Sequence, residues 1–116
     1  MIRIARIYEP SRQADGWRVL VDRLWPRSVK KEAAHVDHWM KEIAPSNHLR
    51  KWFGHKPERW AEFKRRYAAE LAKKKELFGT LRAMERKYGT VTLLFGAKDE
   101  EHNQAVVLRE LLKAKA

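Results

Sequence analysis

Several absences limit what this 116-residue chain can be. It contains no cysteine, which excludes disulfides, thiol catalysis and zinc sites built from cysteine. No apolar run approaches the ~20 residues that a membrane span needs. Arginines interrupt the apolar start MIRIARIYEP, which is typical of a strand rather than a signal peptide. We therefore expect a cytoplasmic protein that does not associate with membranes.

The common phosphate and metal motifs are also missing. With only five glycines, the chain has no Walker loop and no GxGxxG fingerprint, and HExxH is absent too. His35 and His38 lie three residues apart with Asp37 between them, which is weak evidence for zinc. The sequence therefore predicts neither a metal nor another cofactor.

Acidic residues are scarce relative to basic ones, 15 against 26, which gives a formal net charge of +11 and a pI of about 10.2. The excess is concentrated in residues 41–75, where eleven Lys or Arg face four Glu, a net +7. A field of this sign attracts a phosphorylated small molecule or nucleic acid. Lysines and arginines that merely coat solvated helices produce the same excess. The oligomeric state cannot be inferred from the charge.

The length predicts a single domain over residues 1–116, and apolar runs predict its strands. Residues 2–8 alternate apolar and cationic side chains, whereas 17–24 and 90–97 contain continuous apolar runs typical of strands buried on both faces. This indicates an α/β fold with a small, mainly parallel sheet of about three strands flanked by helices, in Rossmann-like layers. Residues 9–16 are short for a parallel crossover, so the direction of the first strand stays open.

Apolar periodicity and capping residues predict the helices between these strands. The predicted helices cover residues 36–43, 47–53, 57–78, 81–88 and 100–113. Ser46, Thr80 and Asp99 are the expected N-caps of the second, fourth and fifth helices. Gly54 and Gly89 are expected to end the second and fourth.

Polar side chains follow the two buried strands at the points where they end. The candidates are Asp22, Arg23, Trp25 and Arg27 after one strand, and Lys98, Asp99, His102 and Asn103 after the other. Ligands of open α/β sheets bind beyond the carboxyl ends of the strands, so parallel strands would place both groups around one crevice. Pro26 fixes the turn before Arg27, whose planar guanidinium suits phosphate or carboxylate.

A third cluster, SNHLRKWFGHKP, interleaves cations with aromatic residues. Such a mixture binds phosphates and stacks bases, and it also anchors helices to a core. We expect Arg50 and His55 to contact a ligand, and Trp52 or Phe53 to pack in the core.

These residues receive provisional roles. Asp22 or Asp99 is the candidate acid–base group or a ribose-type contact, and His102 is the candidate proton shuttle. The candidate ligand contacts are Arg23, Trp25, Arg27, Arg50, His55, Lys98 and Asn103. Structural alternatives remain open: a pair between Asp22 and Arg23, core packing of Trp25, an exposed capped turn at residues 98–99, and a surface position for His102.

Five segments together give the chain a family resemblance. They are DGWRVLVDRLWPR, WMKEIAPS, LRKWFGH, the helix pattern WxxFKRRYxxEL, and VTLLFGAKDEEHNQAVVL. Over nearly its whole length the chain resembles the YeaO-like proteins, a branch of the bacterial family that contains domain of unknown function 488. The resemblance implies an α/β sandwich with a short parallel sheet, and no established activity.

The chain departs from that family pattern at three places. Longer members of the family carry a Cys-His-Arg motif where this chain has EEHNQA, so chemistry by that thiol does not transfer. Ser28 stands where close relatives often have Gly, and Gly96 where they often have Ala or Ser. None of these changes removes a candidate ligand contact.

Three functional hypotheses follow. The first is binding of a phosphate-bearing ligand, such as a nucleotide, at the carboxyl ends of the strands, with hydrolase or transferase activity left open. The second is a nucleic-acid-binding or regulatory module that uses the basic helical region. The third is a partner-binding protein without chemistry, because the first 60 residues hold all five tryptophans and could expose an aromatic patch.

Overall fold

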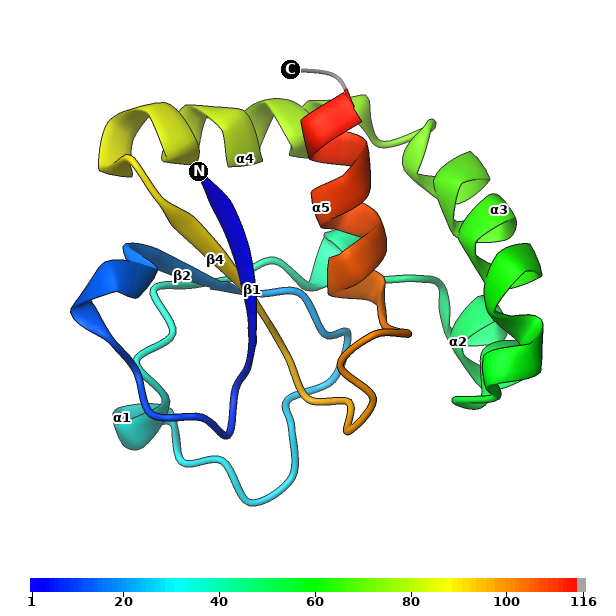
Figure 1. Ribbon diagram of the computed structural model, residues 1–116, viewed down its shortest axis with the longest axis horizontal. Coiled ribbons are helices and arrows are strands. Elements are labelled where there is room, and N and C mark those ends of the chain that lie inside the picture. Colours follow the sequence, from blue (N-terminus) through cyan, green and yellow to red (C-terminus); the bar gives the residue numbers. More distant parts are fainter. Residues whose placement is uncertain (115–116) are drawn as a thin grey trace.

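The computed structural model describes residues 1–114, which are built around a sheet of four parallel strands in the order β1-β4-β2-β3 (Figure 1). The strands are β1 (Ile2–Arg6), β2 (Trp17–Leu20), β3 (His38–Trp39) and β4 (Val91–Phe95). Val91 of the central strand β4 stands opposite Ile2 of β1 and Trp17 of β2. The predicted α/β class with a parallel sheet is confirmed, and β3 is a short fourth strand that the sequence did not indicate.

Five α-helices lie within residues 1–114, together with three single 3-10 turns. The helices are α1 (Lys31–Ala34), α2 (Asn47–Phe53), α3 (Trp60–Leu71), α4 (Lys75–Tyr88) and α5 (Gln104–Ala114). The 3-10 turns cover Gln13–Asp15, Lys41–Ile43 and Pro57–Arg59. In this part of the chain no helix combines the length and apolar character needed to cross a bilayer.

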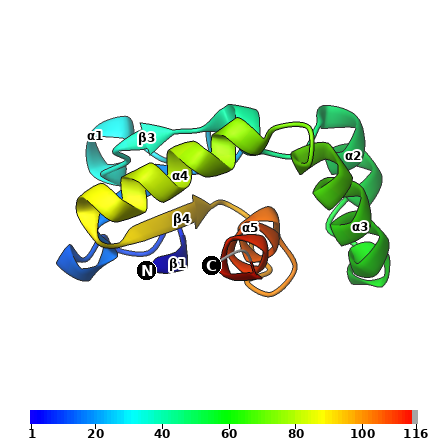
Figure 2. The same cartoon turned by 90° about the horizontal axis from the view of Figure 1, so that it is seen from above.

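The sheet is buried on two faces that differ in what covers them. One face carries alternate strand residues such as Val19, Leu93 and Phe95, and helices α2, α3, α4 and α5 pack against it. The other face carries Leu20 and Leu94 and is covered by α1 and the loops around it. Figure 1 shows α1 apart from the other four helices, and Figure 2 shows α2 and α3 together at the opposite side of the view from α1. The continuous apolar runs therefore meet both layers, as predicted for buried strands.

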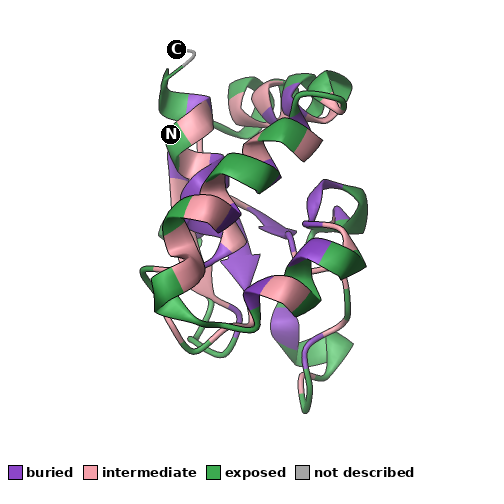
Figure 3. Ribbon diagram, turned by 90° about the vertical axis from the view of Figure 1, so that its right-hand side faces the viewer, coloured by how far each residue is buried: buried purple, intermediate pink, exposed green. Residues whose placement is uncertain are grey.

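Burial follows this layering closely (Figure 3). Every residue of β4 is buried, whereas the helices carry buried residues on the sides that contact the sheet and exposed residues outside. One ion pair lies in the interior, between Arg18 and Asp15. Arg18 also donates to the carbonyl oxygens of Ala34 and His35, so this arginine fastens α1 to the second face of the sheet.

The direction of the first strand is now settled. Both β1 and β2 run parallel to β4, so they are parallel to each other, with β4 between them. The link of residues 7–16 contains one 3-10 turn, and an extended chain of that length spans up to ~35 Å, which suffices for a return along a short strand. Gly16 (φ 64°) completes the link, because a Cβ there would lie 2.3 Å from the carbonyl oxygen of Thr90.

The predicted helix over residues 36–43 is wrong. His38–Trp39 form β3 instead, and the amide of Met40 donates to the carbonyl of Leu20 across to β2. Trp39 packs on the second face and Met40 on the first, which is the alternation of an extended chain. The apolar residues of this segment match helical spacing because some of them are buried on one face of the sheet and the others on the opposite face.

The predicted helix over residues 57–78 is also wrong in its extent, because α3 ends at Leu71 and α4 begins at Lys75. Ala72, Lys73 and Lys74 lie between them, none of the three is buried, and the Nζ of Lys74 donates to the carbonyl of Glu42. Thr80 is therefore no N-cap. It lies inside α4 and donates to the carbonyl of Glu76. Gly89 ends this helix as predicted.

Candidate functional site

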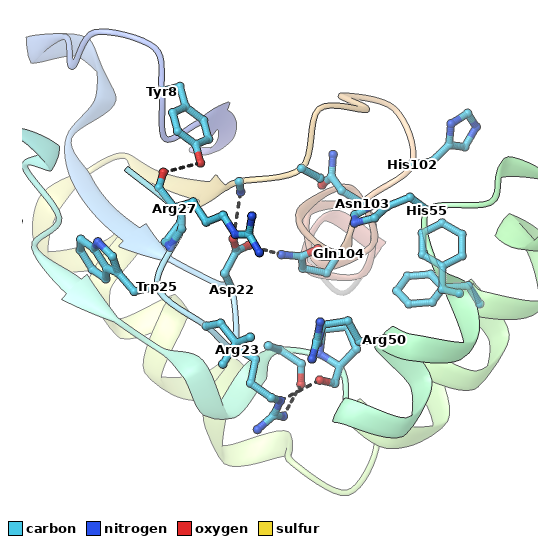
Figure 4. Close-up of a pocket in the computed structure, with 18 residues that line it drawn as sticks. Tyr8, Asp22, Arg23, Trp25, Arg27, Arg50, His55, His102, Asn103 and Gln104 are labelled. Carbon is cyan, nitrogen blue, oxygen red and sulfur yellow. Dashed lines mark hydrogen bonds between the residues drawn. The ribbon is translucent and has the colours of Figure 1, made fainter. Parts of the chain in front are cut away.

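A cavity of about 340 Å³ opens at the carboxyl ends of the four strands (Figure 4). We call it the strand-end pocket. Residues 22–27 after β2 and residues 96, 97 and 102–104 around the start of α5 form much of its wall, and α2 closes one side. The pocket brings together eight of the ten candidate residues: Asp22, Arg23, Trp25, Arg27, Arg50, His55, His102 and Asn103. Lys98 and Asp99 do not line it.

Asp22 lies at the centre of the strand-end pocket. Its carboxylate accepts hydrogen bonds from the amide of Gly96 (3.0 Å) and from the side chain of Gln104. Burial raises the pKa of Asp22 from an ordinary value of 3.8 to about 6, although both hydrogen bonds act to lower it. A carboxyl group with this pKa is ionised to a variable extent near neutral pH, which suits either a proton-linked contact or acid–base chemistry.

Gly96 is required by its close approach to Asp22. A Cβ at this position would lie 2.8 Å from the Asp22 carboxylate and 3.4 Å from the ring of Pro26. The departure from the Ala or Ser of close relatives therefore matters, because glycine lets the end of β4 approach the Asp22 carboxylate and donate to it.

Arg23 has a structural position. Its guanidinium donates to the carbonyl oxygens of Pro45 (2.9 Å) and Ala44 (3.0 Å), both in the segment between β3 and α2. The structural pair between Asp22 and Arg23 that the sequence left open is not formed, since each side chain has other partners. Arg23 thus holds one wall of the pocket in place.

Arg27 differs from Arg23 in having a free side chain. It is exposed, and within residues 1–114 its guanidinium has no hydrogen-bond or ion-pair partner. Figure 4 shows it extending into the pocket toward Asp22. Its backbone carbonyl accepts from the hydroxyl of Tyr8 (2.9 Å), and the next residue, Ser28, has a φ of 62°. That angle explains why relatives often have glycine there.

Trp25 packs at the other side of the same turn. Its indole nitrogen donates to the carbonyl of Val29 (2.7 Å), and its ring meets Trp39 edge to face at 5.4 Å. One edge of the ring remains in the pocket wall. Trp25 therefore combines core packing with a place in the lining.

Helix α2 supplies the opposite wall, as the cluster SNHLRKWFGHKP suggested. Ser46 caps it by accepting from the amide of Leu49, and Gly54 ends it with a φ of 53°, as predicted. Arg50 is exposed and bonds only to Asn47 within the described residues, and His55 is exposed beside the buried ring of Phe53. Arg50 and His55 thus line the cavity on the side across from Arg27 (Figure 4).

The residues after β4 form a turn of their own. Asp99 accepts from the amides of Glu101 and His102, and its second oxygen meets the imidazole of His102 at 2.8 Å. These contacts lower the pKa of Asp99, with the Glu101 amide as the largest cause. The predicted cap of α5 is therefore wrong by four residues: α5 begins at Gln104, and Asn103 accepts from the amide of Val106.

This turn contributes less to the pocket than the sequence suggested. The imidazole of His102 packs against Trp60 and points away from Asp22 in Figure 4. Asn103 uses both ends of its side chain within the turn, donating to the carbonyl of Asp99. Lys98 is exposed and outside the lining. Of the two alternative acid–base candidates, Asp22 lines the pocket and Asp99 does not, whereas His102, the candidate proton shuttle, lines it but is hydrogen-bonded to Asp99.

Sequence reasoning missed Gln104, Tyr8 and Phe63 as lining residues. Gln104 was detectable, because it adjoins the candidate Asn103 and opens the helix after β4. Tyr8 follows β1, so it could have been placed at the pocket once the direction of that strand was known. Phe63 came from a helix interpreted as core, and it is indeed buried. No cluster of three or more His, Asp or Glu suited to a metal ion occurs in residues 1–114.

Comparison with known proteins gives the chain its family. A family model described as "Inactive DUF488-N3 subclade" matches residues 1–116. The uncharacterized protein YeaO of Escherichia coli K12 is 42% identical over 113 residues, covering 97% of each chain. The uncharacterized proteins Mb3100c of Mycobacterium bovis and Rv3073c of Mycobacterium tuberculosis are 40% identical over 114 residues, covering 98% of this chain and 95% of theirs. No solved structure matches. The chain belongs to the DUF488 family, in the subclade described as inactive.

Proposed function

We propose that this protein binds a phosphate-bearing ligand in the strand-end pocket and does not turn it over. The observation that carries the proposal is the free guanidinium of Arg27, which extends into the cavity from a turn fixed by Pro26 and Tyr8. Arginine offers a planar fork of donors that matches phosphate oxygens. The expected setting is the cytoplasm, where phosphorylated metabolites are abundant.

Arg50 and His55 support the same ligand class from across the cavity. Neither side chain has an ion-pair partner in the part of the chain that the structure describes. Three cationic or ionisable donors around one small cavity provide a local positive field, which is what an anion requires. Arg23 is excluded from this group because two carbonyl oxygens already occupy its guanidinium.

Binding is favoured over hydrolase or transferase activity for two reasons. The subclade carries the description inactive, and the family's cysteine is missing from this chain. In addition, Asp99 lies outside the pocket lining and is hydrogen-bonded to His102, whose imidazole packs against Trp60, so these groups and Asp22 do not converge on one ligand atom.

A thermal-shift panel tests the proposal. Nucleotides, sugar phosphates, polyphosphate, and short DNA and RNA oligomers are added to wild-type protein, Arg27→Ala and the matched control Arg86→Ala. Arg86 is exposed near the end of α4, beside the amino end of β4, whereas the pocket lies at the carboxyl ends of the strands. A ligand at a hundred times its dissociation constant stabilises by about 2.7 kcal/mol, a shift of several degrees for this size. Arg27→Ala should abolish that shift. Equal shifts in both variants would overturn the proposal.

Nucleic acid remains a second candidate because Lys51 and Lys56 are exposed and unpaired, within the described residues, beside the same wall of the pocket. Base stacking on Trp52 is not part of this candidate. The guanidinium groups of Arg59 and Arg66 already cover the Trp52 ring, at 5.1 and 4.3 Å from its centre. Backbone contacts alone predict a steep salt dependence, about 0.7 to 0.9 log units per phosphate. Binding of oligomers only, lost with salt, would favour this candidate over a small ligand.

A further inference from the structure

We propose that the ligand of the strand-end pocket is a hydroxylated phosphate ester of mononucleotide size, with its phosphate at Arg27 and a hydroxyl donating to Asp22. This inference rests on the proposed function and adds the class of ligand. A phosphate ester without a hydroxyl group near the phosphate should bind only weakly.

The first step concerns the partners of Asp22, which are all neutral. Gly96 and Gln104 each donate one hydrogen bond to the carboxylate. The adjacent cation, Arg23, is committed to the carbonyls of Ala44 and Pro45. Each carboxylate oxygen has a second lone pair, so two acceptor positions remain for a ligand. A partly buried carboxylate left without a cation is costly, which makes a ligand that supplies a donor favourable there.

The second step concerns Arg27, which lies in the same cavity and has the complementary charge. Both side chains line the cavity, yet among the described residues no ion pair or hydrogen bond joins Arg27 to the Asp22 carboxylate, whose partners are Gly96 and Gln104. The two opposite charges therefore remain separate and available. A ligand that carries an anionic group and a nearby hydrogen-bond donor satisfies both at once. An anion without such a donor reaches Arg27 but leaves Asp22 facing a like charge.

The third step concerns size and apolar contacts. The volume of about 340 Å³ lies at the small end of the range of ~300–1,000 Å³ for small-molecule sites. The rings of Phe53 and Phe63, stacked 4.4 Å apart, form part of the wall. At the mouth, Leu24 is 60% exposed and Tyr8 46% exposed. A mononucleotide offers an apolar planar ring, hydroxyls and a phosphate in one molecule, whereas a dinucleotide would extend beyond the cavity.

The test compares two ligands that differ only in hydroxyl groups. Adenosine 5′-monophosphate and its 2′,3′-dideoxy analogue are titrated by calorimetry at pH 8 and constant ionic strength. A hydrogen bond to a charged group contributes about 1.5–3 kcal/mol, so wild-type protein should bind the parent roughly 10-fold to 150-fold more tightly. In Asp22→Asn this preference should fall to a few-fold. Arg27→Ala should lose both ligands alike, and Arg86→Ala should behave as wild type.

The outcomes separate the two proposals. If both ligands bind wild-type protein with equal affinity through Arg27, the hydroxyl contact is refuted and phosphate binding stands. If Arg27→Ala binds as tightly as Arg86→Ala, the proposed function itself is refuted. The comparison in wild-type protein needs no variant, so it decides the inference even if Asp22→Asn folds poorly. Phenyl phosphate, which has a planar ring but no hydroxyl, should bind like the dideoxy analogue. If phenyl phosphate binds more tightly than adenosine 5′-monophosphate, the inference is contradicted.

Discussion

Replacing Asp22 by Asn should change how stability depends on pH. Burial raises the pKa of Asp22 from 3.8 to about 6 in the folded state. Since the folded protein holds this proton more tightly, the contribution of Asp22 to stability is fully present below about pH 3.8 and is lost as the pH rises through 6. A shift of about two pKa units corresponds to at most about 3 kcal/mol, and partial exposure of the group reduces this.

Asparagine has nearly the same shape and no charge to desolvate. Its oxygen can still accept from Gly96, and the amide of Gln104 can turn to present its oxygen to the new amino group. The variant should therefore gain stability relative to wild type as the pH rises from 4 to 7, by about 1–3 kcal/mol. Above pH 7 the difference should stay constant.

Urea denaturation of both proteins at intervals from pH 4 to 8 measures this difference. The other ionisable groups are the same in both proteins and cancel in the difference. Any fixed cost of the new amide contact shifts the whole curve without changing its slope. A difference that is flat from pH 4 to 8 would show that Asp22 keeps an ordinary pKa, and the account of its desolvation would be wrong.

Three further substitutions test the scaffold around the strand-end pocket, each by thermal or urea denaturation against Arg86→Ala. Gly96→Ala should destabilise by about 1–3 kcal/mol because its Cβ meets the Asp22 carboxylate, and the loss should shrink in an Asp22→Ala background. An equal loss in both backgrounds would contradict the clash. Arg23→Ala should cost about 2 kcal/mol by leaving two carbonyl oxygens without donors, whereas no change would indicate that water replaces it. Ser28→Gly should stabilise by up to about 1 kcal/mol, because φ is 62° there, and a loss would indicate an unseen contact of the hydroxyl.

The elements that the sequence predicted well are those whose signals are local. The cap by Ser46 and the end at Gly54 define α2, and both depend on contacts within one helix. The runs that became β2 and β4 are apolar on both sides of the chain, which only a doubly covered strand or a buried helix produces. These features required no knowledge of distant residues.

The wrong helix predictions fall where contacts with distant parts of the chain determine the secondary structure. Whether residues 38–39 form a helix or a strand depends on the free edge of β2, which lies nearly twenty residues earlier. The separation of α3 from α4 similarly reflects packing over the sheet, because the lysine run itself is compatible with a helix. Propensity and periodicity describe one segment at a time, so tertiary contacts override them.

The same limit applies to the site, and two arginines illustrate it. Arg23 and Arg27 follow the same strand and look equally suited to bind an anion. The acceptors that occupy Arg23 belong to Ala44 and Pro45, about twenty residues later, and the sequence gives no sign of this contact. Only the structure distinguishes the arginine that supports the wall from the one that remains free.

The free guanidinium of Arg27 and the buried carboxylate of Asp22 suit the strand-end pocket to a ligand. A protein selected for stability alone gains little from a desolvated carboxylate and an unpaired guanidinium in one cavity, since replacing or pairing them would be more favourable. The neighbouring Arg23 shows that this fold can satisfy a guanidinium fully with backbone carbonyls. Gly96 and Gln104 hold the Asp22 carboxylate with neutral donors only, and its burial without a cation costs stability. A ligand that donates a hydrogen bond to Asp22 and places an anion at Arg27 offsets this cost. The urea experiments therefore measure the cost of the Asp22 carboxylate without a ligand, and the ligand titrations measure how far a ligand offsets it.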